Sequence, residues 1–74
     1  MDVRKIVGDN FARIRKEKGL TQEQVAERSG FSQQYLSSLE RGQRNPTIIT
    51  IYELSLALGT TYSNLILPEN TQAR

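Results

Sequence analysis

Apolar residues along the first quarter of the chain have the spacing of a helix face. They recur every three or four positions over residues 3–18, at Val3, Val7, Phe11 and Ile14. This spacing is typical of an amphipathic helix with one buried side. Gly19 follows the last of these positions, and glycine readily adopts the left-handed conformation that closes a helix. We expect a first helix over residues 3–18.

A second, shorter helix is predicted to begin after Thr21. Thr21 and Gln24 are spaced as a capping box, in which each side chain binds the backbone N–H of the other residue. Val25 and Ala26 are the apolar residues expected to face inward. Gly30 follows Ser29 and supplies the stop, so this helix has only about two turns.

Ser32 is a good N-cap for a third helix that runs to about Arg41. Leu36 and Leu39 define its buried side, and Gly42 marks its end. Only the short segment over residues 28–32 separates the second helix from the third. Two short helices joined in this way are typical of a helix-turn-helix, in which the second helix protrudes from the body.

Two more helices complete the pattern. Residues 43–46 form a loop ending in Pro46, and Thr47 can then cap a fourth helix. Its predicted buried stripe is Ile48, Ile51, Leu54 and Leu58, and Gly59 ends it. The fifth helix runs from Thr61 to about Leu67 with three apolar residues, Tyr62, Leu65 and Ile66. Pro68 closes this helix, and no alternating strand pattern occurs, so we predict an all-α fold of five helices.

The outward side of the third helix carries hydrogen-bonding groups. At about 100° per residue, Leu36 and Leu39 facing inward place four polar residues on the opposite side. These are Gln34, Ser37, Ser38 and Arg41, with Gln33 at the edge of the same face. Amides can pair bidentately with adenine in the major groove, and small hydroxyls allow a close approach to base edges. This face is therefore our candidate for reading DNA bases.

The start of the second helix offers a complementary feature. Free N–H groups near Thr21 and Gln22 form a partial positive end that suits a phosphate, and the Gln22 amide adds a donor. The distribution of charge weakly favours the same kind of partner. Residues 1–20 carry six basic and three acidic side chains, within a total formal charge of +2. A basic region favours a polyanionic partner, although a solvated helix face explains it equally well.

The composition excludes several functional classes. The chain has no cysteine and no histidine, so it offers neither a disulfide framework nor an ordinary zinc site. The carboxylates are scattered and no glycine-rich phosphate loop occurs, so we predict that the protein is not an enzyme and needs no metal or cofactor. No small-molecule ligand is evident. No apolar run is long enough to span a bilayer and no secretory signal is visible, so we expect a cytoplasmic protein.

Taken in order, these motifs resemble a known family. The shared residues are Gly19 to Ala26, then Gly30, Phe31 and Ser32, then Leu39 to Gly42, and Pro46. They are similar to the Cro/C1-type helix-turn-helix family of phage repressors and small bacterial regulators, over about residues 7–66. The resemblance implies a lambda-repressor-like domain that binds double-stranded DNA. Its small size is similar to that of the stand-alone controllers of restriction-modification systems.

The resemblance also assigns roles to individual residues. It implies base contacts from Ser32, Gln33, Gln34, Ser37 and Ser38. It implies phosphate contacts from Gln22, Arg41, Gln43 and Arg44, to which we add Thr21 and Tyr35. Tyr35 lies between the inward and outward sides, so packing and a phosphate hydrogen bond are both open to it. Arg15 and Glu40 match a structural ion pair of the family.

A second apolar stripe bears on assembly. Ile49, Tyr52 and Leu56 have helical spacing on the fourth helix, offset from its core stripe, and Leu67 lies near the end of the fifth. One interpretation is a homodimer interface that places two reading helices one DNA turn apart. The other is that Val3 and Ile6 of the first helix cover part of the stripe.

We therefore expect one helix-turn-helix domain over residues 1–68, followed by a flexible polar tail over residues 69–74. The predicted function is a transcriptional regulator that binds a two-fold symmetric operator as a homodimer. The competing hypothesis is a protein-binding module, such as an antitoxin or an assembly adaptor, because one fold can serve both roles.

Overall fold

The computed structural model describes residues 2–69, and all the regular secondary structure in that part of the chain is helical. Its five helices are α1 (Val3–Glu17), α2 (Gln22–Ser29), α3 (Gln33–Glu40), α4 (Ile48–Leu58) and α5 (Tyr62–Ile66). The predicted all-α fold with five helices is confirmed. The three predicted N-caps are present: the side chains of Thr21, Ser32 and Thr47 each accept a hydrogen bond from a backbone N–H in the following turn. Thr61, predicted as the first residue of the fifth helix, caps that helix in the same way.

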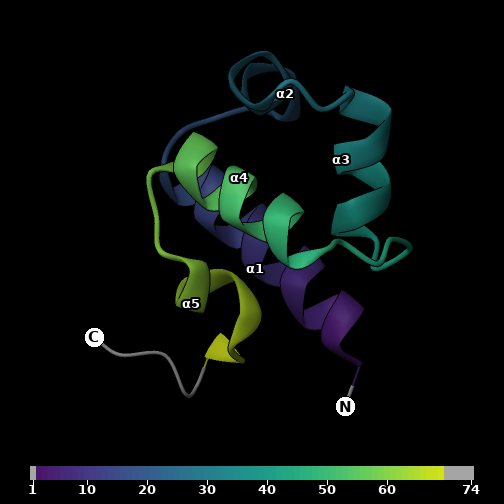
Figure 1. Ribbon diagram of the computed structural model, residues 1–74. Coiled ribbons are helices and arrows are strands. Elements are labelled where there is room, and N and C mark those ends of the chain that lie inside the picture. The colour runs from purple at the N-terminus through teal and green to yellow at the C-terminus, as the bar shows by residue number, and fades with distance from the viewer. Residues whose placement is uncertain (1, 70–74) are drawn as a thin grey trace.

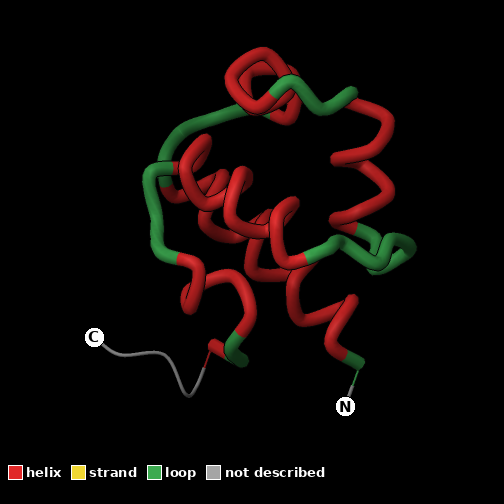
Figure 2. The backbone as a smooth tube through the Cα atoms, viewed as in Figure 1, coloured by secondary structure: helices red, strands yellow, loops and turns green. Residues whose placement is uncertain are grey.

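The helices pack around one another without a layer of sheet. In Figure 1, α4 crosses in front of α1, α2 closes one end of the body and α3 stands along one side. Helix α1 packs against α3 and α5, whereas α2 packs against α3 and α4. Figure 2 shows that short loops join most of the elements. Of the helices that follow one another in sequence, α2 packs against α3 and α4 against α5, whereas the contacts of α1 with α3 and α5 join segments far apart in the chain.

A single apolar core lies between these helices. Its fully buried members include Phe11 of α1, Val25 of α2, Leu36 of α3, Leu54 of α4 and Leu65 of α5. Each helix therefore contributes at least one side chain that is removed from water, which is the dominant favourable contribution to folding. Because α3 is anchored by buried leucines on one side only, its opposite side remains free.

Helices α1 and α3 approach each other closely at Gly8. A side chain here would overlap the backbone carbonyl oxygen of Leu39 and come within 3.1 Å of that of Glu40. Glycine is required because even a methyl group would push the two helices apart. Gly8 is buried in this contact, and its role had no signal in the apolar pattern.

Asn10 ties α1 to the end of α5. It is only 3% exposed, and its Nδ2 donates to the carbonyl oxygens of Leu65 at 2.9 Å and Leu67 at 2.7 Å. Carbonyl groups at a helix C-terminus have no partner within the helix, so this amide satisfies two of them. The five-residue helix α5 is thereby held in place by a buried polar side chain as well as by Leu65.

Two predicted inward positions are wrong. Val3 is 57% exposed and Ile48 is 72% exposed. Each is the first residue of its helix, and at that point the helix axis has not yet reached a neighbouring helix that would cover the side chain. The helical period predicts which residues share a face, but it does not show where along the axis the packing begins.

The predicted tail, residues 69–74, lies outside the described residues apart from Glu69. The Glu69 carboxylate lies 3.7 Å from the guanidinium of Arg13, and Glu17 lies 3.6 Å from the same group. Glu69 therefore still contacts α1, one residue beyond Pro68.

Candidate nucleic-acid interface

The turn between α2 and α3 is formed by local hydrogen bonds and one glycine. Gly30 has φ +82°, in the left-handed region, and its N–H donates to the carbonyl oxygen of Ala26 at 3.0 Å. The Ser29 hydroxyl accepts from the N–H of Phe31 at 3.2 Å, and the Ser32 hydroxyl accepts from the N–H of Tyr35 at 3.0 Å. These contacts fix the direction in which α3 leaves the turn.

The outward face of α3 begins with three exposed polar residues. Ser32, Gln33 and Gln34 are all exposed. Ser37 follows on the same side and is half-buried, with its hydroxyl accepting from Nη1 of Arg41 at 2.7 Å. Four of the five predicted base-contacting residues therefore lie at or near the surface of one helix face.

The fifth residue, Ser38, does not belong to that face. It is 9% exposed, and its hydroxyl donates to the carbonyl oxygen of Gln34 at 3.0 Å. The prediction of an outward Ser38 is wrong because the buried side of α3 is wider than Leu36 and Leu39 alone imply. A hydroxyl bonded to the preceding turn fits this position, since its polar group stays satisfied without water.

The loop after α3 gathers the predicted phosphate-contacting residues. Arg41, Gln43 and Arg44 are all exposed. Nε of Arg41 donates to Oε1 of Gln43 at 3.3 Å, and the Arg44 guanidinium lies 5.2 Å from the centroid of the Tyr35 ring. A cation over an aromatic face is attracted to the ring, so Arg44 is orientated towards α3.

Tyr35 connects this loop to the turn. Its ring stacks on that of Phe31, with the centroids 5.3 Å apart and the planes at 21°. Burial raises the pKa of the Tyr35 phenol, and the positive charge of Arg44 opposes this effect more weakly. The phenol is therefore protonated at neutral pH and available as a hydrogen-bond donor. The sequence analysis gave Phe31 no functional role. The spacing of four residues between Phe31 and Tyr35 was the signal that could have indicated their stacking.

The start of α2 has the geometry of an anion-facing helix end. Thr21 and Gln24 form the predicted capping box, with the Thr21 N–H donating to Oε1 of Gln24 at 2.9 Å and the Gln24 N–H donating to the Thr21 hydroxyl at 3.0 Å. Thr21 is exposed and Gln22 is half-buried. The cap satisfies two of the free N–H groups of this helix end, those of Thr21 and Gln24, and the remaining ones stay available.

The ion pair expected between Arg15 and Glu40 joins α1 to α3. Nε of Arg15 lies 2.7 Å from Oε2 of Glu40, and Nη2 donates to Oε1 at 3.2 Å. Nη1 of Arg15 also donates to the carbonyl oxygen of Leu20 at 2.8 Å. Their side chains are only 11% and 13% exposed. This bidentate pair holds the C-terminal end of α3 against the body.

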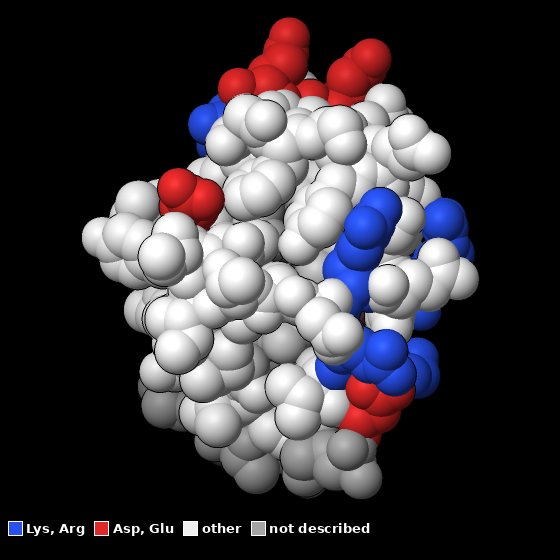
Figure 3. Space-filling model, turned by 45° about the vertical axis from the view of Figure 1, so that its right-hand side comes forward, with Lys and Arg blue, Asp and Glu red and all other residues white. Residues whose placement is uncertain are grey.

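Charge is unevenly distributed over the molecule. Figure 3 shows basic side chains gathered on one side of the α3 face, and acidic ones mainly at the end of the body where α2 lies in Figure 1, with others at the left of the view and directly below the lowest basic ones. Between them the surface is largely uncharged. An uncharged hydrogen-bonding face bordered by cations is suited to a duplex, whose bases are neutral and whose edges carry phosphates.

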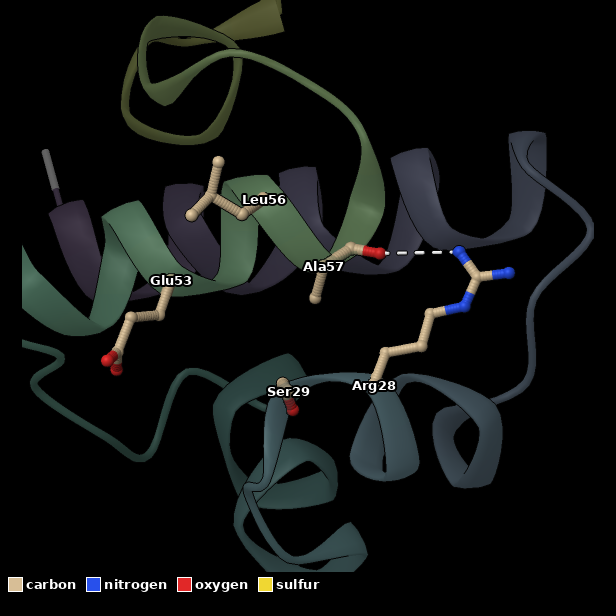
Figure 4. Close-up of a pocket in the computed structure, with 5 residues that line it drawn as sticks. All are labelled: Arg28, Ser29, Glu53, Leu56 and Ala57. Carbon is tan, nitrogen blue, oxygen red and sulfur yellow. Dashed lines mark hydrogen bonds between the residues drawn. The ribbon is translucent and has the colours of Figure 1, made fainter.

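A shallow groove lies away from this face, between α2 and α4. It has a volume of about 400 Å³ and is lined by Arg28, Ser29, Glu53, Leu56 and Ala57. Figure 4 shows Arg28 extending towards α4, where Nη1 donates to the carbonyl oxygen of Ala57 at 3.5 Å. The groove has no set of groups placed for catalysis.

The predicted dimer residues are uncovered in the single chain. Ile49 is 69% exposed, Tyr52 55%, Leu56 63% and Leu67 39%. The alternative, in which Val3 and Ile6 cover part of the stripe, is not supported: the three α4 residues stay more than half exposed, and Val3 is itself exposed.

The described residues define a small helical domain with a helix-turn-helix, and comparison with known proteins places it in a family. Residues 11–65 match the helix-turn-helix family HTH_3. The chain belongs to this Cro/C1-type family of DNA-binding transcriptional regulators, which are not enzymes. No helix within residues 2–69 is both long enough and apolar enough to cross a membrane.

Several relatives are similar along most of their length. The uncharacterised HTH-type transcriptional regulator y4dJ of Sinorhizobium fredii is 71% identical over 92% of this chain and 88% of the relative. The crystal structure of the hypothetical transcription factor NHTF from Neisseria has a TM-score of 0.88 at 32% identity, covering 93% of this chain and 79% of NHTF.

A third similar protein has been solved with DNA. The restriction-modification controller C.Esp1396I, a tetramer in complex with its natural 35-base-pair operator, has a TM-score of 0.78 and 33% identity, covering 82% of this chain and 80% of the controller. The resemblance to controller proteins is thus found in structure as well as in size.

Proposed function

We propose that this regulator reads a two-fold symmetric operator as a homodimer, with α3 in the major groove of each half-site. The observation that carries the proposal is the exposed face of Ser32, Gln33 and Gln34 at the start of α3. This face carries no charge of its own and is held by the turn and by the Arg15–Glu40 pair. In helix-turn-helix proteins the N-terminal residues of the second helix contact base edges.

Gln33 and Gln34 are proposed to select adenine. A glutamine amide can accept from N6 and donate to N7 of adenine, and each good bidentate pair contributes about 1–3 kcal/mol of discrimination. Ser32 and Ser37 allow the helix to approach closely because their side chains are short. Ser38 is excluded from this role by its burial.

Contacts with the DNA backbone are proposed on both sides of the face formed by Ser32, Gln33 and Gln34. Thr21 and Gln22 are proposed to contact one DNA strand from the start of α2. On the other side, the DNA backbone is proposed to meet the loop after α3, through Arg41, Gln43 and Arg44, and the Tyr35 phenol in the first turn of α3. These groups would fix the register in which the glutamines meet bases. The stacking of Arg44 on Tyr35 restricts the guanidinium before DNA arrives, which reduces the entropy lost on binding.

Two observations support the homodimer. The principal extents of the body are 30 × 24 × 20 Å, and it presents one α3. Half-sites one turn apart are separated by about 34 Å, so one copy cannot read both. The exposed stripe of Ile49, Tyr52 and Leu56 provides an apolar surface on α4 that a second copy can bury.

The base-reading role is tested by selecting bound sites from random DNA and then comparing Gln34→Ala with Gln22→Ala. Gln34→Ala is expected to weaken binding to the selected operator by about 1–3 kcal/mol and to affect random DNA much less. Gln22→Ala is expected to weaken both alike. Equal losses on both DNAs for Gln34→Ala would contradict base reading, and the spacing of selected half-sites reports the dimer.

The dimer surface is tested by sedimentation equilibrium of Ile49→Ser and Leu56→Ser, with Val3→Ser as the matched control. Val3 is 57% exposed on α1, outside the stripe. Both stripe variants are expected to dissociate at concentrations at which the wild type and Val3→Ser stay dimeric. A wild type that is monomeric at all concentrations would refute the homodimer.

The competing function is a protein-binding module that uses the same stripe for a foreign partner. The exposed Ile49, Tyr52 and Leu56 are the specific observation in its favour. Failure of the wild type to bind genomic DNA fragments at low salt would favour this alternative. The family and the polar face of α3 favour DNA, and we propose a cytoplasmic location on the same basis.

A further inference from the structure

The first turn of α1 lies directly against the loop that follows α3. Gly42 has φ +74°, and a Cβ built on it would lie 3.3 Å from Cα of Lys5 and 3.6 Å from its Cβ. Residues separated by 37 positions in sequence are thus in backbone contact. Lys5 therefore lies against the loop that carries the cations Arg41 and Arg44.

We propose that Lys5 extends the contact with the DNA backbone beyond the helix-turn-helix, so that α1 binds a phosphate next to those bound by the loop. The proposal rests on the proposed function and adds to it an element outside the motif. We call Lys5, Arg41 and Arg44 together the basic end. The phosphates concerned belong to double-stranded DNA and flank the base-reading region.

The exposure of Lys5 suits it to this role. Its side chain is 71% exposed and pairs with Asp9 of the same helix at 3.4 Å, where Asp9 is itself 60% exposed. An exposed pair one helical turn apart is weak and is screened by salt. The Lys5 ammonium can therefore leave Asp9 for a phosphate at little cost.

The surface view and the geometry of DNA agree with this placement. In Figure 3 most of the basic side chains gather towards the part of the molecule where the first turn of α1 meets the loop after α3 in Figure 1, and acidic side chains lie directly below the lowest of them. A duplex carries one negative charge for about every 1.7 Å of its axis. A backbone that reaches Arg41 and Arg44 therefore offers further phosphates alongside, within the reach of a neighbouring cation.

The matched control for Lys5 is Lys18. The Nζ of Lys18 donates to the carbonyl oxygen of Gly59, which follows the C-terminal end of α4. The loop of the basic end instead precedes the N-terminal end of α4. The 11 residues of α4 span about 16 Å, so the two lysines lie at different ends of the body. Lys5→Ala and Lys18→Ala remove the same charge from an exposed position.

The experiment measures the affinity of the selected operator for the wild type, Lys5→Ala and Lys18→Ala as a function of salt. Each lost phosphate contact reduces the slope of log Kobs against log salt by about 0.9, which gives about 1.8 for a dimer on two half-sites. The ratio of the wild-type affinity to the Lys5→Ala affinity should thus fall about tenfold between 50 and 200 mM salt. Lys18→Ala is expected to keep the wild-type slope.

The outcomes separate this inference from the function on which it rests. A Lys5→Ala slope equal to those of the wild type and Lys18→Ala overturns the role of Lys5 but leaves operator binding intact. A wild type whose affinity does not fall steeply with salt refutes the DNA-binding proposal itself. Asp9→Asn supplies a second readout: with its competitor removed, Lys5 should bind phosphate more readily, so the variant should bind the operator more tightly.

Discussion

Replacing Gly8 by alanine sets two known effects against each other. Alanine is favoured over glycine within a helix by about 1 kcal/mol, so the residues of α1 alone predict a more stable protein. The structure predicts the opposite. The added methyl group would overlap the carbonyl oxygen of Leu39 and lie within 3.1 Å of that of Glu40. Both atoms belong to the α3 backbone, so no rotamer change can relieve the contact.

The steric cost exceeds the gain in helix propensity. Overpacking a well-packed interior costs about 1–3 kcal/mol and occasionally more, and a contact with backbone falls at the high end. A net destabilisation of about 2 kcal/mol follows for Gly8→Ala. For a domain of this size, 1 kcal/mol corresponds to about 4–8 °C in Tm, so Tm should fall by roughly 10 °C. Because α3 must shift, affinity for the operator should fall as well.

Thermal unfolding followed by circular dichroism tests this reasoning. The neighbouring exposed position provides the control: Asp9→Gly and Asp9→Ala both lose the pair with Lys5, so their difference measures helix propensity alone in the same helix. Asp9→Ala should be the more stable of the two by up to about 1 kcal/mol. A Gly8→Ala protein as stable as the wild type, or more stable, would show that α1 and α3 are not in the close contact described.

Two further predictions concern the groups around α3. Glu40→Ala leaves the Arg15 guanidinium largely buried without its partner and should lower the free energy of unfolding by about 3–5 kcal/mol. The double change Arg15→Met with Glu40→Leu should recover most of this loss. Chemical denaturation measures both, and a double variant no more stable than Glu40→Ala would contradict this explanation. Burial raises the pKa of Tyr35, so its contribution to stability is complete below the ordinary tyrosine pKa and is lost as pH rises through the folded value. Unfolding midpoints above pH 10 should therefore fall less steeply for Tyr35→Phe than for the wild type, and parallel curves would argue against the burial of this phenol.

Local sequence signals predicted the helices well because each signal is contained within about one turn. The capping box of Thr21 and Gln24 and the N-cap at Ser32 require only a side chain and an N–H group three residues away. The end of α2 at Gly30 depends on the conformational freedom of one residue. These features do not depend on what packs against the helix, so they could be predicted before the fold was known.

The candidate site was predictable in part, and the error at Ser38 has the same cause as the error at Ile48 in the predicted core. Gln33 and Gln34 are exposed as expected, but Ser38 is buried and Ile48 is uncovered. Helical periodicity groups residues on a face. How wide the buried face is, and where along the helix it begins, depends on the positions of the neighbouring helices. Those positions are set by contacts between residues far apart in the chain.

The amino-acid sequence by itself determined the five helices, the N-caps of α2, α3 and α4, the helix-turn-helix and the family, since these follow from short-range periodicity and motif spacing. Only the tertiary structure decided that the backbone of α3 approaches α1 closely at Gly8, that Asn10 holds the end of α5, and that Lys5 lies beside Gly42. The physical reason is that close packing joins residues dozens of positions apart, and such a contact leaves no periodic trace in either segment.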